Sequence, residues 1–147
     1  MYSSAIVFLL LTTPDLDDVH MGLTSGINHV TIPTPDLDRM ARFYNEAFEA
    51  MTVFEAPAST NYPRMAIVEL GEGRYVKLVE GTSGSPHAES RAERFGIAVA
   101  SRQSLNALRV HMLAVGVDVD EIEQLPTQWV MWVRDPDGAA LQVCAHR

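Results

Sequence analysis

The side chains of this sequence that could do chemistry begin with a single histidine in a strand-like run. His29 lies among β-branched residues in the run 27–33, whereas the four histidines at positions 20, 87, 111 and 146 show no metal-ligand spacing. A lone strand histidine can be a hydrogen-bonding wall residue, a ligand or a catalytic group, and the pattern leaves these alternatives open. The sequence contains no Ser-His-Asp or Cys-His arrangement and no glycine-rich phosphate loop.

Lys77 is the only lysine of the chain, and it lies inside a second strand-like run. Two-residue alternation puts Tyr75, Lys77 and Val79 on one face of that strand and Val76 and Leu78 on the other. A lysine that shares a face with an aromatic residue indicates either a partly polar cleft or a solvated surface. The sequence leaves both interpretations open.

Trp129 and Trp132 are separated by three residues in the run 128–133. In a strand this spacing points the two side chains to opposite faces. We expect one tryptophan to contact the helix layer or a partner and the other to line a cleft, where it would suit a flat or apolar ligand. The alternative is that both are core or interface residues.

The elements that must position these residues follow one order twice, namely strand, helix, strand, strand, strand. Residues 82–93, rich in Ser, Gly, Pro and charge, separate the two copies and predict a linker. Asp36 and Ser101 are the expected N-caps of the two helices. The expected strands are 27–33, 51–56, 64–70 and 74–80 in the first copy, and 95–100, 117–122, 128–133 and 139–145 in the second.

Composition and charge exclude several classes of protein. The chain has 147 residues, which fits one domain, and its 47% hydrophobic and 20% charged residues are typical of a soluble globular protein. The net charge is −8 and no basic cluster exists, so we expect neither nucleic acid nor a membrane surface as a partner. The only cysteine, Cys144, cannot form an intrachain disulfide, which favours a reducing cytoplasm.

The apolar run Ala5–Leu11 is the one segment with some likeness to a targeting signal. No lysine or arginine precedes it and no small-residue cleavage site follows it, so we do not expect a signal peptide. It is also far too short to span a bilayer. We interpret it as a strand or as an extension upstream of a start at Met21.

Two groups of residues resemble a known family. The segments 29–32, 35–37 and 43–44 are similar to the opening strand and helix of the vicinal oxygen chelate superfamily, and 134–142 is similar to its C-terminal signature. That superfamily includes glyoxalase I, extradiol dioxygenases, methylmalonyl-CoA epimerase, and bleomycin and fosfomycin resistance proteins. We therefore expect an N-terminal extension over 1–26, followed by a single domain over 27–147 with modules at about 27–81 and 94–146.

The resemblance implies an α+β fold of two βαβββ modules, with curled mixed sheets around a cleft and helices on the outer face. It also implies up to four metal ligands, whose positions fall on His29, Lys77, Gly96 and Gln142. A catalytic divalent ion needs about three imidazole or carboxylate donors. Only His29 is such a donor, so we expect no metal cofactor and only vestigial ligand positions.

The function implied first is metal-independent binding of a small organic molecule, as in ligand sequestration or resistance to antibiotics and natural products. By analogy with such relatives we expect a cytoplasmic homodimer with its clefts at or near the dimer interface, and an anionic or aromatic ligand. The expected ligand contacts are His29, Lys77, Gly96, Trp129, Trp132 and Gln142.

The alternative function is that of an enzyme of the same family. A metal-free isomerase, lyase or cyclase would use His29 or Glu69 as its general base. A glyoxalase-like or dioxygenase-like enzyme would instead retain a divalent metal through His29, Gln142 and a carboxylate. The sequence does not separate these alternatives, because one fold supports many chemistries.

Overall fold

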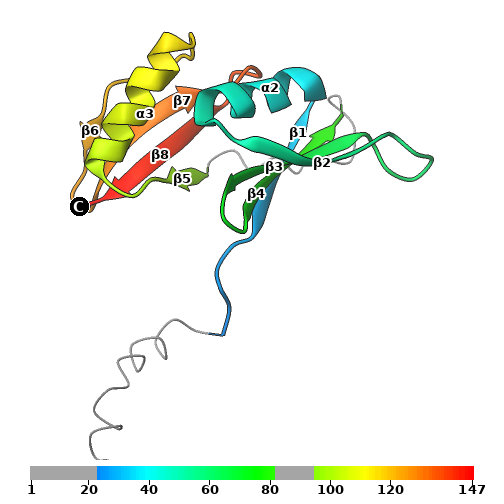
Figure 1. Cartoon of the computed structure of the whole chain (residues 1–147), viewed down its shortest axis with the longest axis horizontal. Helices are drawn as coiled ribbons and strands as arrows, with labels where there is room; N and C mark the ends of the chain where they lie inside the picture. The colour runs from blue at the N-terminus through cyan, green and yellow to red at the C-terminus, as the bar shows by residue number, and fades with distance from the viewer. Residues whose placement is uncertain (1–22, 82–94) are drawn as a thin grey trace, which may run out of the picture.

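The order of elements expected from the sequence occurs twice in the structure. The structure is a computed structural model that describes residues 23–81 and 95–147 (Figure 1), so the run Ala5–Leu11 and the linker 82–93 lie outside the described residues. The α+β fold of two βαβββ modules is confirmed. The first module contains β1 (His29–Thr34), α2 (Leu37–Phe48), β2 (Met51–Ala56), β3 (Met65–Gly71) and β4 (Arg74–Glu80), and the second contains β5 (Gly96–Ala98), α3 (Arg102–Ala114), β6 (Glu123–Gln124), β7 (Gln128–Arg134) and β8 (Ala140–His146).

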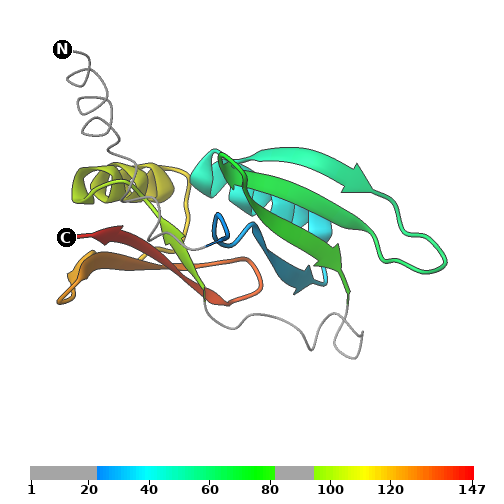
Figure 2. The same ribbon diagram turned by 90° about the horizontal axis from the view of Figure 1, so that it is seen from below.

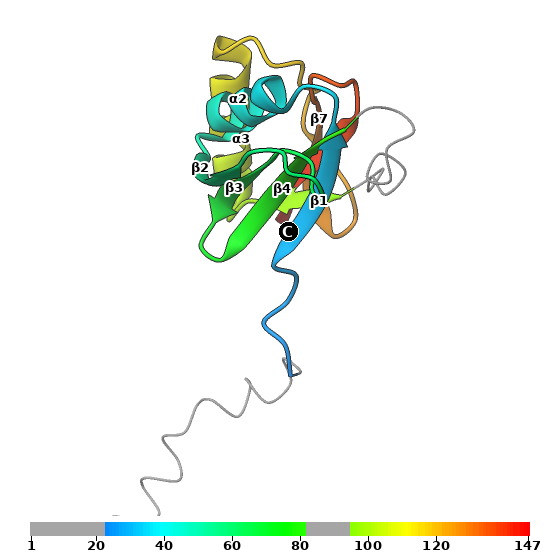
Figure 3. The same cartoon turned by 90° about the vertical axis from the view of Figure 1, so that its right-hand side faces the viewer.

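Each module forms one four-stranded mixed sheet. Sheet A has the strand order β1-β4-β3-β2, and sheet B has the order β5-β8-β7-β6. In each sheet the first strand runs parallel to the last, while the other neighbours are antiparallel. Figures 2 and 3 show α2 against sheet A and α3 against sheet B. Within the described residues, no helix is long and apolar enough to cross a membrane.

The third strand of the second module differs from the prediction. The sequence predicts a strand over 117–122, but the structure has a single bridge from Val119 to β7 before the two-residue strand β6. The carboxylates of Asp118 and Asp120 instead lie 3.5 and 3.0 Å from the guanidinium of Arg134. Hydrogen bonds from Arg134 hold the pKa of Asp120 below its usual value. The backbone is also paired here, because the Arg134 amide donates to the Asp118 carbonyl and the Asp120 amide donates to the Trp132 carbonyl, each at 2.9 Å. The side-chain ion pairs therefore accompany a short stretch of backbone pairing.

The two modules share one hydrophobic core. Helices α2 and α3 are in contact, and buried residues of both helices and both sheets form a single cluster. Both sheets therefore turn their apolar faces to this common core. Their opposite faces, called here the open faces, are directed away from it. Helix α2 contributes Leu37, Met40, Phe43, Tyr44 and Ala47 to the cluster, and α3 contributes Leu105 and Met112.

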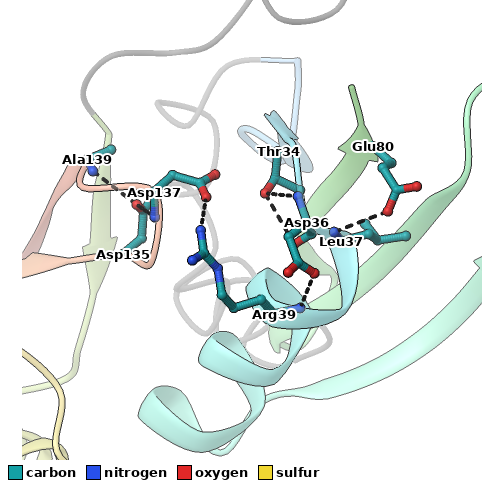
Figure 4. Close-up of polar contacts among 8 residues, drawn as sticks. All are labelled: Thr34, Asp36, Leu37, Arg39, Glu80, Asp135, Asp137 and Ala139. Atoms are coloured by element: carbon teal, nitrogen blue, oxygen red, sulfur yellow. Dashed lines mark hydrogen bonds and ion pairs between the residues drawn. The ribbon is translucent and has the colours of Figure 1, made fainter. Parts of the chain in front are cut away.

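Residues 35–37, part of the first segment that carries the family resemblance, determine where α2 begins. Asp36 is the N-cap, and its side chain accepts a hydrogen bond from the Arg39 amide at 3.0 Å. Thr34 Oγ1 accepts from the Asp36 amide, and Glu80 at the end of β4 accepts from the Leu37 amide, both at 3.3 Å (Figure 4). These bonds attach the helix to both β1 and β4, which sets the position of sheet A beneath it.

The second family segment forms the turn between β7 and β8. Asp135 is buried, and its Oδ1 accepts hydrogen bonds from the amides of Asp137 and Ala139, each at 3.0 Å. Gly138 has a φ of 84°, a conformation that favours glycine. Arg39 of α2 reaches this turn and lies 2.9 Å from Asp137 (Figure 4). An ion pair between the modules thus joins α2 to the turn that the second segment forms.

A second polar contact joins the modules through their helices. His111 Nε2 of α3 lies 2.7 Å from the carbonyl oxygen of Glu46 in α2. This contact and the pair between Arg39 and Asp137 involve residues near the two ends of α2. Apolar packing and these polar contacts together hold one module against the other.

Candidate functional site

The open face of sheet A carries three rows of side chains that the strand register brings side by side. The first row is polar, the second places a lysine between a threonine and an isoleucine, and the third is apolar. The rows are His29, Tyr75 and Glu69; Thr31, Lys77 and Ile67; and Pro33, Val79 and Met65. The face is thus polar toward the start of β1 and apolar toward its end.

Lys77 is partly buried in the middle of this face. Of the part of the chain that the structure describes, no residue forms a hydrogen bond or an ion pair with its ammonium group. His29 is more exposed, and its Nδ1 lies 3.2 Å from the side-chain oxygen of Asn28. The ammonium group of Lys77 is therefore unpaired among the described residues.

The open face of sheet B carries smaller and less charged residues. Gly96, Gln142 and Trp132 form one row across β5, β8 and β7. A Cβ atom at Gly96 would lie 3.6 Å from Cys144 Sγ and 3.9 Å from Gln142 Oε1, so both side chains border the space above the glycine. Burial raises the pKa of the Cys144 thiol. Gln142 therefore lies between Gly96, which has no side chain, and Trp132.

The two tryptophans occupy different environments. Trp132 is in register with Gln142 on the open face. Trp129 is packed against the shared core, and the guanidinium of Arg102 from α3 lies 4.2 Å from its ring centroid. The guanidinium of Arg147 lies 5.6 Å from the same centroid. Trp129 is therefore a helix-side residue, away from the other residues predicted to contact a ligand.

The structure divides the predicted site residues into two groups. His29, Glu69 and Lys77 lie on sheet A, whereas the group on sheet B is Gly96, Trp132 and Gln142. Sequence reasoning did not identify Thr31 and Ile67, which flank Lys77, because alternation along one strand does not reveal its pairing partners. Alternation does predict Tyr75 on the same face as Lys77, but it does not reveal that Tyr75 lies between His29 and Glu69.

The residues at the expected ligand positions do not fit a divalent metal ion. Lys77 would repel a cation, Gly96 has no side chain and Gln142 is a neutral amide. In the described ranges no group of three or more His, Cys, Asp or Glu side chains could hold a metal ion. Apart from His29, these positions lack the imidazole and carboxylate donors that a catalytic divalent ion needs.

A family model now identifies the class of the protein. The model of the Glyoxalase/Bleomycin resistance protein/Dioxygenase superfamily matches residues 26–143. The chain belongs to this superfamily, which confirms the resemblance noted in its sequence. No curated protein matches the chain significantly.

Several solved structures are similar to this chain. The glyoxylase/bleomycin resistance protein/dioxygenase domain from Frankia sp. EAN1pec has 23% identity and a TM-score of 0.70, over 84% of this chain and 99% of that one. Lactoylglutathione lyase from Agrobacterium tumefaciens has 17% identity and a TM-score of 0.67, over 84% and 96%. TnmS3, an antibiotic binding protein from Streptomyces sp. CB03234, has 18% identity and a TM-score of 0.68, over 86% and 99%. Identities this low establish the fold alone.

Proposed function

We propose that this protein is a cytoplasmic, metal-independent binder of a small organic molecule, acting in ligand sequestration or in resistance to an antibiotic or natural product. The observation that carries the proposal is the chemistry of the open faces. Lys77, Gly96 and Gln142 occupy the positions at which the family resemblance predicts metal ligands, and none of them is an imidazole or a carboxylate. An organic ligand, unlike a cation, finds a charge, a hydrogen-bonding amide and free space there.

The proposed contacts follow from these side chains. Lys77 donates a charge-assisted hydrogen bond to a carboxylate, phenolate or other anionic oxygen of the ligand. Trp132 offers its ring to a flat or apolar part of the ligand, and Gln142 beside it supplies an amide donor and acceptor. Gly96 leaves the ligand room where a side chain would otherwise project. TnmS3, which is described as antibiotic binding, supports this use of the fold.

The proposal includes a symmetric homodimer. Within one chain both open faces are directed away from the shared core, so Lys77 and Trp132 do not face one another. A second copy of the chain would bring sheet A of one protomer opposite sheet B of its partner. A two-fold arrangement of this kind forms two equivalent sites and is the commonest closed assembly.

Two measurements on the tag-free protein test the proposal. Elemental analysis should find no stoichiometric Zn, Fe, Mn, Ni or Mg. About one ion per chain that is lost in His29→Ala would contradict the metal-free assignment. Tryptophan fluorescence, titrated with 4-methylbenzoate and with neutral 4-methylbenzyl alcohol, then reports on the ligand contacts.

The fluorescence titration has a charge-matched control. Lys77→Met should lower the affinity for 4-methylbenzoate by about ten- to a hundredfold, the equivalent of roughly 1.5–3 kcal/mol. It should leave the affinity for the alcohol nearly unchanged. Arg74→Met removes a positive charge from the same strand but at an exposed position, and it should change neither affinity. Equal losses for both probes in Lys77→Met would show that Lys77 does not contact the ligand.

The alternative is a metal-free enzyme, and one observation favours it. His29, Tyr75 and Glu69 lie in one row on the open face of sheet A, so an imidazole, a phenol and a carboxylate share one surface. Such groups could move a proton on an enolisable or cyclisable ligand, with His29 or Glu69 as general base. Turnover in metal-free buffer that is lost in Glu69→Gln or His29→Ala would establish this function in place of simple binding.

A further inference from the structure

Two residues of opposite charge lie on neighbouring strands of the same open face. Glu69 of β3 is paired in register with Tyr75, and Lys77 of β4 is paired with Ile67. The two charged residues are therefore diagonal neighbours, about 7–8 Å apart and somewhat less between their Cβ atoms. Alternation along each strand turns both side chains to the face opposite the core.

Neither charge is neutralised by the described residues of the chain. Glu69 and Lys77 form no ion pair with one another or with any other described side chain. Elsewhere the chain pairs its charges closely, as between Arg64 and Asp38 at 2.5 Å. Both unpaired groups are partly buried, and partial burial of an unpaired charge is unfavourable. This face is complementary to a ligand that supplies both partners.

The side chains between the two charged residues limit the chemical nature of the group that connects the two charges of such a ligand. Ile67, which is in register with Lys77, lies on the same strand and the same face as Glu69, so it lies between the two charged residues. Tyr75, beside Glu69, adds an aromatic ring. A flat or apolar body between the charges of a ligand would bury its surface against these side chains.

We propose that the ligand is zwitterionic, with a cationic amine bound by Glu69 and an anionic oxygen bound by Lys77. This inference rests on the proposed binding function, and it adds the second charge and the residue that recognises it. The charges of the ligand are separated by a distance comparable to the diagonal spacing of the two residues, about 7 Å. A singly charged ligand would leave one of the two protein charges unpaired.

Four probes of the same shape test this inference in wild-type protein. They are 4-(aminomethyl)benzoate, 4-methylbenzoate, 4-methylbenzylamine and 4-methylbenzyl alcohol, followed by chemical-shift titration of the backbone amides. The zwitterion should bind about tenfold or more tightly than either singly charged probe, and the alcohol most weakly.

Variants assign each charge to its residue. Glu69→Gln should lower the affinity of the zwitterion to that of 4-methylbenzoate and leave 4-methylbenzoate unchanged. Lys77→Met should lower the affinity of the zwitterion to that of 4-methylbenzylamine. Glu72→Gln, at the exposed turn between β3 and β4, removes a nearby negative charge as a control and should have no effect.

The outcomes separate this inference from the proposed function. A zwitterion that binds no better than 4-methylbenzoate, with Glu69→Gln indifferent, overturns the inference while binding through Lys77 stands. Failure of all four probes to bind contradicts the proposed function and the inference together. Equal effects of Glu69→Gln and Glu72→Gln would show only a general electrostatic influence and would also overturn the inference.

Discussion

Sheet A and sheet B have the same strand order but present different chemistry on their open faces. Sheet A consists of strands of six or seven residues and carries Glu69 and Lys77. Sheet B contains a three-residue and a two-residue strand, and it carries Gly96 and Trp132. The same strand order thus presents two charged side chains on one sheet and a tryptophan beside a glycine on the other.

The helices differ in a related way. Helix α2 buries five residues and contacts α3 as well as three strands of sheet A. Helix α3 buries only Leu105 and Met112, and it exposes Val110 and Leu113. The first module therefore provides most of the side chains around which both modules pack. These differences between the modules predict measurable changes in the free energy of unfolding and in ligand affinity.

The largest expected effect comes from the shared core. Met40 of α2 and Met112 of α3 are both fully buried, so Met40→Ala and Met112→Ala should each lower the free energy of unfolding by about 2–5 kcal/mol. Because both residues belong to one cluster, denaturation should remain a single transition in either variant. Two separated transitions, with only one shifted by Met112→Ala, would show that the modules unfold independently.

The next effect distinguishes the two faces of β7. Trp132→Ala should weaken ligand binding by about tenfold and change stability little, because its ring lies on the open face. Trp129→Ala should do the reverse and lower the free energy of unfolding by roughly 2 kcal/mol, since its ring packs against the core and Arg102. Calorimetric titration with 4-methylbenzoate and urea denaturation of both variants measure the two effects. Loss of binding in Trp129→Ala alone would reverse the assignment.

A smaller effect is expected at the ion pair between the modules. The Asp137 side chain is only 9% exposed, so Arg39→Met should lower the free energy of unfolding by about 1–2 kcal/mol. Arg64→Met breaks the exposed pair with Asp38 within the first module and should have a smaller effect. Thermal denaturation of both variants makes the comparison. A larger loss in Arg64→Met would mean that the inter-module pair does not fix the modules.

The smallest effect concerns the thiol on sheet B. Because burial raises the pKa of Cys144, its thiolate should form at higher pH than that of a free cysteine. Alkylation by iodoacetamide should therefore be slow near neutral pH and rise with a midpoint above that of a free thiol. A midpoint at or below that of free cysteine would mean that the thiol is not shielded on this face.

Much of the fold follows from local sequence patterns, whereas the site depends on pairing between distant segments. Alternation around Lys77 predicted β4, and the N-caps Asp36 and Ser101 predicted where both helices begin. The row that joins Tyr75 to His29 depends on the pairing of β4 with β1, which no local pattern reports. The strand predicted over 117–122 is reduced to a single bridge at Val119, with backbone hydrogen bonds that join Asp118 and Asp120 to β7. The division of the site between two sheets reflects how both modules pack on one core.

The central claim is that each ligand site combines sheet A of one chain with sheet B of its partner and requires no metal ion. Mixed dimers of Lys77→Met and Trp132→Ala chains test it most directly, by calorimetry with 4-methylbenzoate in buffer stripped of metal ions. Each variant alone should bind weakly, whereas the mixed dimer should regain one site of wild-type affinity, because one of its two sites has both faces intact. A mixed dimer without any full-affinity site would contradict the account.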